Sequence, residues 1–321
     1  MCLRLQNIPK TFSFFAKNNL LQKESTFNTF RWLIVAALAL TWGSSFILMK
    51  KGLVGLLPVQ VASLRICITA LALLPFTITH FRKVEKSKIK FVVLSGLLGS
   101  DIPAFLFATA QTHLNSSLAG VLNTLTPVWA LFLGIVLFKL KTTWLQIAGI
   151  LVGFFGAASL VLFAHHSAQQ TLNSDMKYAL LIVLATCMYG FNLNIMRKYL
   201  LGVKPIEIAS LAFFFISLPV VIYLFGFTDF IQRLQTNPEA LSSLGFVSIL
   251  AVVGTAIASL VFYWLVQKTS TLFAAITTYF IPVVAVIWGA IDGESITYLH
   301  FVGLGLILLG VWMVTFKKSK T

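Results

Sequence analysis

The sequence predicts an all-α integral membrane protein with ten transmembrane helices, arranged as two inverted five-helix repeats. Three observations predict this class: an apolar composition, ten long apolar segments, and an internal duplication. The 321 residues are 58% hydrophobic and only 10% charged, whereas soluble domains carry about 25% charged residues. Lipid is therefore the expected solvent, and helices are the expected spanning structure because they satisfy every backbone polar group within one segment.

Ten apolar segments approach the roughly 20 residues that a helix needs to cross the hydrocarbon core. They lie at residues 32–49, 59–79, 91–111, 117–138, 144–163, 178–196, 206–225, 241–266, 272–291 and 298–316. The expected organisation is a cytoplasmic amino-terminal tail (1–31), a first repeat (32–163), an outside loop (164–177), a second repeat (178–316) and a basic cytoplasmic tail (317–321). Within the first of these, residues 1–29 are expected to be irregular and mobile. A later start of the mature chain within residues 1–29 is an alternative.

The duplication is visible in two motifs that recur at constant offsets. The pattern Trp42-Gly43, Lys50-Lys51 and Pro58-Val59-Gln60 returns 147 residues later as Tyr189-Gly190, Arg197-Lys198 and Pro205-Ile206-Glu207. Gly99, Phe107, Pro127 and Gly134 return 155 residues later as Gly254, Phe262, Pro282 and Gly289. Five helices per repeat is an odd number, so the second repeat is expected to enter the membrane inverted. Inverted repeats are typical of secondary transporters, with the substrate site near the bilayer midplane.

The distribution of basic residues predicts the orientation. If the amino terminus is inside, the inside segments hold 19 lysines and arginines, and the outside segments hold four: Lys50, Lys51, Lys177 and Arg233. Cytoplasmic loops of membrane proteins carry this excess. We therefore expect a multi-pass protein of the cell (inner) membrane with both termini cytoplasmic. The formal net charge of +15 is explained by these loops and not by nucleic-acid binding.

An ordered set of short motifs over residues 32–316 carries a family resemblance. It comprises Trp42-Gly43-Ser44-Ser45, Arg65, Leu125-Thr126-Pro127, Phe280-Ile281-Pro282 and Gly293-Glu294-Ser295-Ile296-Thr297. With the duplication, this set resembles the EamA-type permeases of the drug/metabolite transporter superfamily. The resemblance implies five plus five helices and a cargo among amino acids, drugs, nucleotide-type metabolites or sugars. One departure is that the stretch after the fourth span reads Phe138-Lys139-Leu140-Lys141, so the glutamate that the family often carries there is missing. We therefore assign no paired role to Glu294.

Polar residues within the expected spans are the candidates for lining a substrate cavity. Some lie in stripes of small residues, for which close helix packing is the alternative role. Trp42 lies near mid-depth, which favours a cavity wall over an interface anchor. Pro127 and Pro282 are expected to distort their helices. The candidate cavity residues are Trp42, Ser45, Asp101, Asn123, Thr126, Tyr189, Asn192, Thr255, Ser259, Tyr263 and Thr278.

Asp101 is the one acidic residue expected near the bilayer centre, where an ionisable group is expensive and suggests a function. Three roles remain open: a proton-coupling carboxylate, a partner for an ammonium group of the substrate, or a structural ion pair with Arg65. Arg65 is the one basic residue deep in a span. The helical rise places the two within about 5 Å of each other in depth.

The predicted function is a secondary transporter that exports an amino acid or a related polar metabolite by alternating access. Alternatives are an uptake or exchange carrier for a nucleotide-like metabolite such as S-adenosylmethionine, and an intramembrane enzyme or lipid-handling protein. The sequence contains no Walker, HExxH or nucleophile-elbow motif, which argues against ATP-driven transport, and no CxxC spacing. An intramembrane enzyme normally needs His, Asp or Glu clustered at one membrane face, whereas this chain has one central Asp and scattered histidines. We therefore expect no enzyme activity, catalytic residue, metal or cofactor.

The expected partners are a small-molecule substrate, the lipid bilayer and, as a candidate coupling ion, a proton. The glycine-rich segments 144–163 and 298–316 suit either a weak homodimer or tight packing within a monomer.

Overall fold

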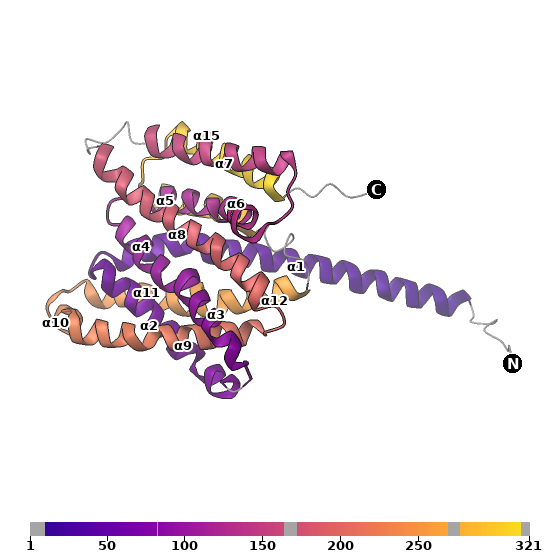
Figure 1. Ribbon diagram of the computed structural model, residues 1–321, viewed down its shortest axis with the longest axis horizontal. Helices are drawn as coiled ribbons and strands as arrows, with labels where there is room; N and C mark the ends of the chain where they lie inside the picture. The colour runs from indigo at the N-terminus through magenta and orange to yellow at the C-terminus, as the bar shows by residue number, and fades with distance from the viewer. Residues whose placement is uncertain (1–9, 82, 164–171, 269–276, 316–321) are drawn as a thin grey trace.

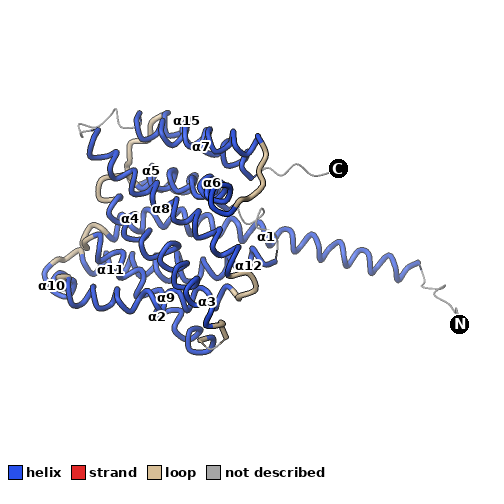
Figure 2. The backbone as a smooth tube through the Cα atoms, in the orientation of Figure 1, coloured by secondary structure: helices blue, strands red, loops and turns tan. Residues whose placement is uncertain are grey.

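The computed structural model describes residues 10–81, 83–163, 172–268 and 277–315, and within these ranges every regular element is a helix (Figures 1 and 2). Seven segments of this part of the chain are long and apolar enough to cross a membrane: Phe30–Gly52, Pro58–His80, Lys86–Ala110, Ser116–Phe138, Met176–Tyr199, Pro205–Phe227 and Ala240–Phe262. Three shorter apolar helices are Trp144–Ser159, Phe280–Ile291 and Tyr298–Val314. The all-α membrane class is confirmed, and the ten-span inverted repeat stays a prediction.

The elements are α1 (Lys10–Gly52), α2 (Pro58–His80), α3 (Lys86–Gly96), η1 (Leu97–Asp101), α4 (Ile102–Ala110), α5 (Ser116–Leu122), η2 (Asn123–Leu125), α6 (Thr126–Phe138), α7 (Trp144–Phe163), α8 (Leu172–Tyr199), α9 (Pro205–Phe227), α10 (Phe230–Thr236), α11 (Ala240–Ala251), η3 (Val252–Ile257), α12 (Ala258–Lys268), α14 (Thr277–Ile291) and α15 (Tyr298–Thr315). The segments η1 and η3 are π-helical, and η2 is a 3₁₀ turn.

The amino-terminal segment differs from the irregular tail that the sequence predicts. α1 begins at Lys10 and runs for 43 residues, and its first part projects beyond the bundle (Figure 1). No glycine or proline occurs between Pro9 and Gly43, so no residue in this stretch breaks the helix. The expectation of irregular structure was therefore wrong from Lys10 onward.

The bundle is assembled by pairing helices of the first half of the chain with helices of the second half. α7 packs along α15, α2 along α9, and α1 along α14. Figure 1 shows the α7–α15 pair at one edge of the molecule and α2 and α9 at the opposite side. The interface between the halves therefore runs through the whole bundle, and residues between the paired helices can be contributed by both halves.

The duplicated Pro-x-[Gln/Glu] motif forms the same helix start twice. Pro58 and Pro205 occupy the first turns of α2 and α9, where a missing backbone N–H costs nothing. The side chain two residues later accepts the N–H that precedes each helix: Gln60 Oε1 from Leu57 at 3.0 Å, and Glu207 Oε2 from Lys204 at 3.1 Å. This local hydrogen bonding is the physical reason for the repeated motif.

Two π-helical segments interrupt the bundle at matching places. Residues 97–101 form η1, and residues 252–257 form η3. The two segments begin 155 residues apart, which is the offset that relates Gly99 to Gly254. In η3 the Thr255 hydroxyl donates to the carbonyl of Leu250, 3.1 Å away, and so occupies the widened turn. Such π-bulges occur often at functional sites.

The break expected at Pro127 is present. Pro127 has no N–H for the carbonyl of Asn123, four residues earlier. The 3₁₀ turn η2 lies immediately before this proline, and the Thr126 hydroxyl donates to the Asn123 carbonyl at 2.9 Å. Pro282 lies inside α14, whose preceding residues 269–276 are outside the described part of the chain.

Close glycine contacts join α7 and α15. A Cβ atom on Gly310 would lie 2.6 Å from the Gly153 backbone nitrogen and 2.7 Å from the Gly149 carbonyl oxygen. One on Gly149 would lie 2.7 Å from Met313 Cβ. These glycines therefore pack against the facing helix within one chain, and a homodimer through the same two helices stays a prediction.

Changing Gly310 to Ala should destabilise the protein, because backbone atoms of α7 cannot move aside as a flexible side chain would. We expect a loss of about 1–3 kcal/mol, the usual range for overpacking, measured as a lower Tm in detergent. Gly305→Ala is the matched control, since nothing lies within 4 Å of a Cβ at that position. Equal Tm values for the two variants would contradict the close packing of α7 on α15.

Candidate functional site

Arg65 projects from the face of α2 that is turned toward the interior of the bundle. Its Nε donates to the Thr255 hydroxyl of η3 at 3.0 Å. Thr69, one turn further along α2, is fully buried and donates to the Ala251 carbonyl at 3.0 Å. Leu71 and Ile78, on the other side of this helix, are 68% and 73% exposed and mark its outward face. Arg65 therefore lies where α2 crosses the helix containing η3.

Tyr189 of α8 approaches Arg65 from the second half of the chain. Its hydroxyl lies within electrostatic range of the Arg65 guanidinium group. The Tyr189 ring stacks at 6.1 Å on Phe107 of α4. The aromatic ring is thus held by the first half, while its hydroxyl lies near the partly buried cation.

Trp42 and Ser45 of α1 lie against the same π-helical segment, η3. The Trp42 indole donates from Nε1 to the Gly254 carbonyl at 3.1 Å, and its ring packs edge-on against Phe262 at 5.0 Å. A Cβ atom on Gly254 would lie 3.0 Å from Ser45 Oγ, so α1 and η3 are in close contact there. Around η3, the structure thus brings together Trp42, Ser45, Thr255, Tyr189 and Arg65, which we call the η3 cluster.

Asp101 is the last residue of η1, and it does not form the ion pair with Arg65 that was one of its three open roles. Its Oδ1 is buried and has no hydrogen-bond partner within the described residues, and the Arg65 Nε is bonded to Thr255 instead. The Cys67 thiol of α2 lies within electrostatic range of the carboxylate. The structural-partner interpretation therefore finds no contact here, and a buried carboxylate oxygen is left without a donor, which is energetically costly.

The other predicted cavity residues are more dispersed. Asn192 of α8 is 8% exposed, and its Oδ1 is buried without a partner in the described part of the chain. Its amide nitrogen packs directly against Gly99 of η1. The Thr126 hydroxyl is used locally by Asn123, as described above. Asn123, Ser259 and Thr278 are half-buried, and the Tyr263 side chain lies outside the described part of the chain.

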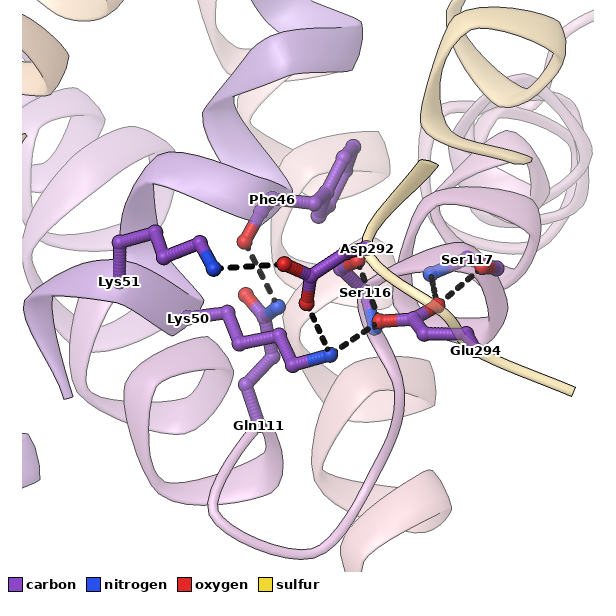
Figure 3. Close-up of polar contacts among 8 residues, drawn as sticks. All are labelled: Phe46, Lys50, Lys51, Gln111, Ser116, Ser117, Asp292 and Glu294. Carbon is purple, nitrogen blue, oxygen red and sulfur yellow. Dashed lines mark hydrogen bonds and ion pairs between the residues drawn. The ribbon is translucent and has the colours of Figure 1, made fainter. Parts of the chain in front are cut away.

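A second polar cluster, which the sequence did not predict, lies where α1 ends and α5 begins (Figure 3). Glu294, with a side chain only 2% exposed, accepts from Lys50 Nζ at 2.8 Å, from the backbone N–H groups of Ser116 and Ser117 at 2.9 and 3.1 Å, and from both serine hydroxyls. Asp292 pairs with Lys50 at 2.7 Å and with Lys51 at 2.6 Å. We call this cluster the clamp; its members are Lys50, Lys51, Ser116, Ser117, Asp292 and Glu294.

The clamp corrects our expectation that Glu294 has no paired role. That expectation depended only on the missing counterpart glutamate after the fourth span. The actual partners come from α1 and from the start of α5, which are distant in the chain. One signal was available: two of the few lysines expected on the outer side, Lys50 and Lys51, share that side with Asp292 and Glu294.

Local backbone geometry makes room for the clamp. Gly293 has a φ of +78° and turns the chain after α14, a conformation that glycine adopts at no steric penalty. A Cβ atom on Gly289 would collide with Ser117 Oγ and Glu294 Oε2. Glu294 also places negative charge at the start of the Ser116–Phe138 span, where unpaired N–H groups and the helix dipole favour an anion.

The two carboxylates stay ionised at neutral pH. Burial raises the pKa of Glu294, but hydrogen bonds from Lys50, Ser117 and Ser116 outweigh it and lower the pKa to about 2. Hydrogen bonds from Lys50 and Lys51 lower the pKa of Asp292 as well. The clamp is therefore a set of permanent charges over the physiological range.

The opposite end of the bundle, where α6 and α8 finish, has no comparable clamp among the described residues. Leu140 folds back toward Gly134 in the same way that Glu294 folds back toward Gly289. A Cβ atom on Gly134 would lie 2.6 Å from Leu140 Cδ1. Lys139, Lys141, Arg197 and Lys198 are exposed there, and Lys198 Nζ lies 5.4 Å from the Phe138 ring centroid. We call this the basic end and the other the clamp end.

Replacing Glu294 by Gln should destabilise the protein in a pH-dependent manner. Because the folded pKa is lowered, the carboxylate stabilises the fold fully above its ordinary pKa of 4.5, and this contribution is lost as the pH falls toward 2. We expect the free energy of unfolding to fall by about 1.5–3 kcal/mol at pH 7. The difference between the variant and the wild type should become smaller below pH ~4.5. The Tm values of wild type and Glu294→Gln, measured at several pH values, test this. Glu239→Gln, an exposed position, is the control, and a pH-independent difference would contradict the assignment.

Lys50 and Lys51 form a second comparison within the clamp. Lys50 contacts both carboxylates, whereas Lys51 contacts Asp292 alone and is more exposed, at 43% against 33%. Lys50→Met leaves the buried Glu294 charge without a cation, so we expect the free energy of unfolding to fall by about 3 kcal/mol. Lys51→Met should lose less than about 1 kcal/mol. Thermal unfolding of both variants measures the difference, and the reverse order would show that Lys50 does not hold the clamp.

Comparison with known proteins identifies the family. The model of the EamA-like transporter family matches the chain twice, at residues 30–162 and 176–316. An uncharacterized transporter of Archaeoglobus fulgidus is 25% identical over 90% of this chain and 99% of its own length. The uncharacterized inner membrane transporter YedA of Escherichia coli K12 is 26% identical over 88% of this chain and 89% of its own.

A third relative is named a probable amino-acid metabolite efflux pump, from Escherichia coli K12. It is 24% identical and covers 88% of this chain and 94% of its own length. A solved crystal structure with 15% sequence identity superposes with a TM-score of 0.57, covering 89% of this chain and 96% of its own, which supports the fold. These findings identify a membrane transporter and not an enzyme. With most of its length matched in two successive copies, the chain belongs to the EamA-like transporter family.

Proposed function

We propose that the protein is a secondary carrier that exports an amino acid or a related polar metabolite by alternating access. The observation that carries this proposal is the pair of opposite charges in the spans. Arg65 and Asp101 have no ion-pair partner among the described residues, although unpaired charge at membrane depth is expensive. A cargo with groups of both signs supplies the missing partners, and amino acids are the simplest such solutes.

The arrangement of the halves supports alternating access. The family model matches each half separately, and η1 and η3 interrupt both halves at corresponding positions. Carriers of this kind bind cargo between two repeats that rock against each other. The clamp links the ends of helices at one end of the bundle by ion pairs and hydrogen bonds, while the basic end has four exposed cations around α6 and α8. The positive-inside rule assigns the basic end to the cytoplasm, so the clamp lies on the outer side.

The names of relatives agree with this cargo class. One is a probable amino-acid metabolite efflux pump and another an inner membrane transporter. A nucleotide-like cargo such as S-adenosylmethionine is the second candidate, because the stacked Tyr189–Phe107 pair lies beside Arg65 and could take up an aromatic base. That compound also carries a carboxylate and an ammonium group, so it belongs in the same substrate panel.

Transport in proteoliposomes tests the proposal. We expect saturable flux of at least one labelled amino acid or adenine-containing metabolite, driven by an imposed pH gradient if a proton is coupled. Asp101→Asn should reduce this flux at least about tenfold, which corresponds to about 1.4 kcal/mol. Glu239→Gln, an exposed position, should transport at the wild-type rate. Both variants are first checked for monodispersity and Tm.

Three outcomes oppose the proposal in different ways. Silence of the wild type across the panel would overturn a polar-metabolite carrier. Flux that ignores the gradient and survives Asp101→Asn would make the protein a facilitator in which Asp101 takes no part in coupling. Flux into right-side-out vesicles measures uptake, and flux into inside-out vesicles measures export. Uptake without export would reverse the proposed direction.

A further inference from the structure

We propose that Arg65 is the binding site for a carboxylate of the cargo and that Thr255 positions it; this assignment rests on the proposed function and names part of its substrate. A guanidinium group carries five N–H donors in a planar fork that matches a carboxylate with two parallel hydrogen bonds. The structure uses one of these donors, on Nε, and gives the others no partner within the described residues.

Thr255 is hydrogen-bonded so that it holds Arg65 without neutralising it. The threonine hydroxyl donates its single hydrogen to the Leu250 carbonyl at 3.1 Å. Its oxygen is then free to accept from Arg65 Nε at 3.0 Å. The widened turn of η3 thus orients the arginine through a neutral group and leaves its charge uncompensated. The uncompensated charge and the remaining N–H donors are the groups that would bind an incoming anion.

The surroundings of Arg65 favour an incoming anion. Within the described residues, the one titratable group in electrostatic range of Arg65 is the Tyr189 hydroxyl, which can donate a hydrogen bond to a bound carboxylate. No described acidic side chain competes for the arginine. Because Arg65 belongs to α2 and Tyr189 to α8, a carboxylate held by both connects the two halves of the chain.

The second repeat shows whether the helix crossing at Arg65 needs a charged residue for packing. The counterpart of Arg65 in the second repeat is Ala212, and that of Thr69 is Ile216, both at the offset of 147. Ala212 and Ile216 pack against Gly96 of α3, where a Cβ atom would lie 3.1 Å from each side chain. The same helix crossing is therefore built in the second repeat without any charge. Folding alone does not explain why Arg65 is charged.

Pairs of probes that differ only at the carboxylate test the assignment on the full-length protein. Suitable pairs are L-leucine with L-leucinamide, and L-phenylalanine with L-phenylalaninamide, with 4-methylpentanoate as a carboxylate that lacks the amine. The increase in Tm with probe concentration yields an apparent Kd, independent of transport. We expect the wild type to bind at least one acid about 10- to 100-fold more tightly than its amide, the range for hydrogen bonds to a charged partner.

Substitutions at Arg65 should change this ratio selectively. Arg65→Gln should reduce the acid-to-amide ratio to near one by weakening the acid and leaving the amide unaffected. Arg65→Lys should restore part of the preference, because it keeps the charge but not the planar fork. Arg197→Gln, which removes an exposed arginine at the basic end, is the matched control and should keep the wild-type ratio. If Arg65→Gln does not fold, Thr255→Val replaces it, and we expect a three- to tenfold lower ratio from the lost orientation.

The results separate this assignment from the proposed function. Equal binding of acids and amides by the wild type, no stabilisation by any carboxylate probe, or an unchanged ratio in Arg65→Gln would each overturn the carboxylate site. Acid-selective binding that depends on Arg65, without flux in proteoliposomes, would support the site and overturn the carrier. Flux of amides and acids at equal rates would support a carrier and overturn the site.

Discussion

The buried carboxylate of Glu294 is the contact on which the clamp end of the bundle depends. It connects the end of α1 through Lys50 and the start of α5 through two backbone N–H groups and two hydroxyls. An ion with a side chain only 2% exposed has lost its hydration, so each of these donors replaces water that is no longer present. Removal of one of these donors leaves the buried charge less well solvated. Three segments distant in the sequence are thereby held at fixed positions.

The two ends of the bundle differ in charge: the clamp end contains paired lysines and carboxylates, and the basic end contains exposed cations. At the clamp end the chain after α14 folds back with a glutamate, and at the basic end the chain after α6 folds back with Leu140. Separating the helices at the clamp end requires breaking the ion pairs of Glu294 and Asp292. At the basic end the same movement separates exposed cations that repel one another. Two related halves can therefore stabilise contact at one end more than at the other through a few side chains, without any change in helix packing.

The sequence predicted those features whose causes are local. The repeated helix starts follow from Pro58 and Gln60 and from Pro205 and Glu207, and the break before Pro127 follows from its missing N–H. The clamp was not predicted, because its members come from three separate segments and only their positions in the fold bring them together. The Arg65–Asp101 ion pair was one of three open roles for Asp101, and it was suggested by depth alone. Depth does not specify which way a helix face turns, and the structure directs Arg65 toward η3.

The duplicated fold also explains why its charged residues are informative. In the second half, α9 crosses α3 through a neutral contact between Ala212 and Gly96. The corresponding crossing of α2 on η3 carries Arg65, and the counterpart of Asp101 is Ala256. Each charge therefore occurs in one half only, at a position where the other half shows that alanine suffices for packing. A charge at a position where the other half packs with alanine points to a role other than packing, because an ionisable group within a membrane span is expensive.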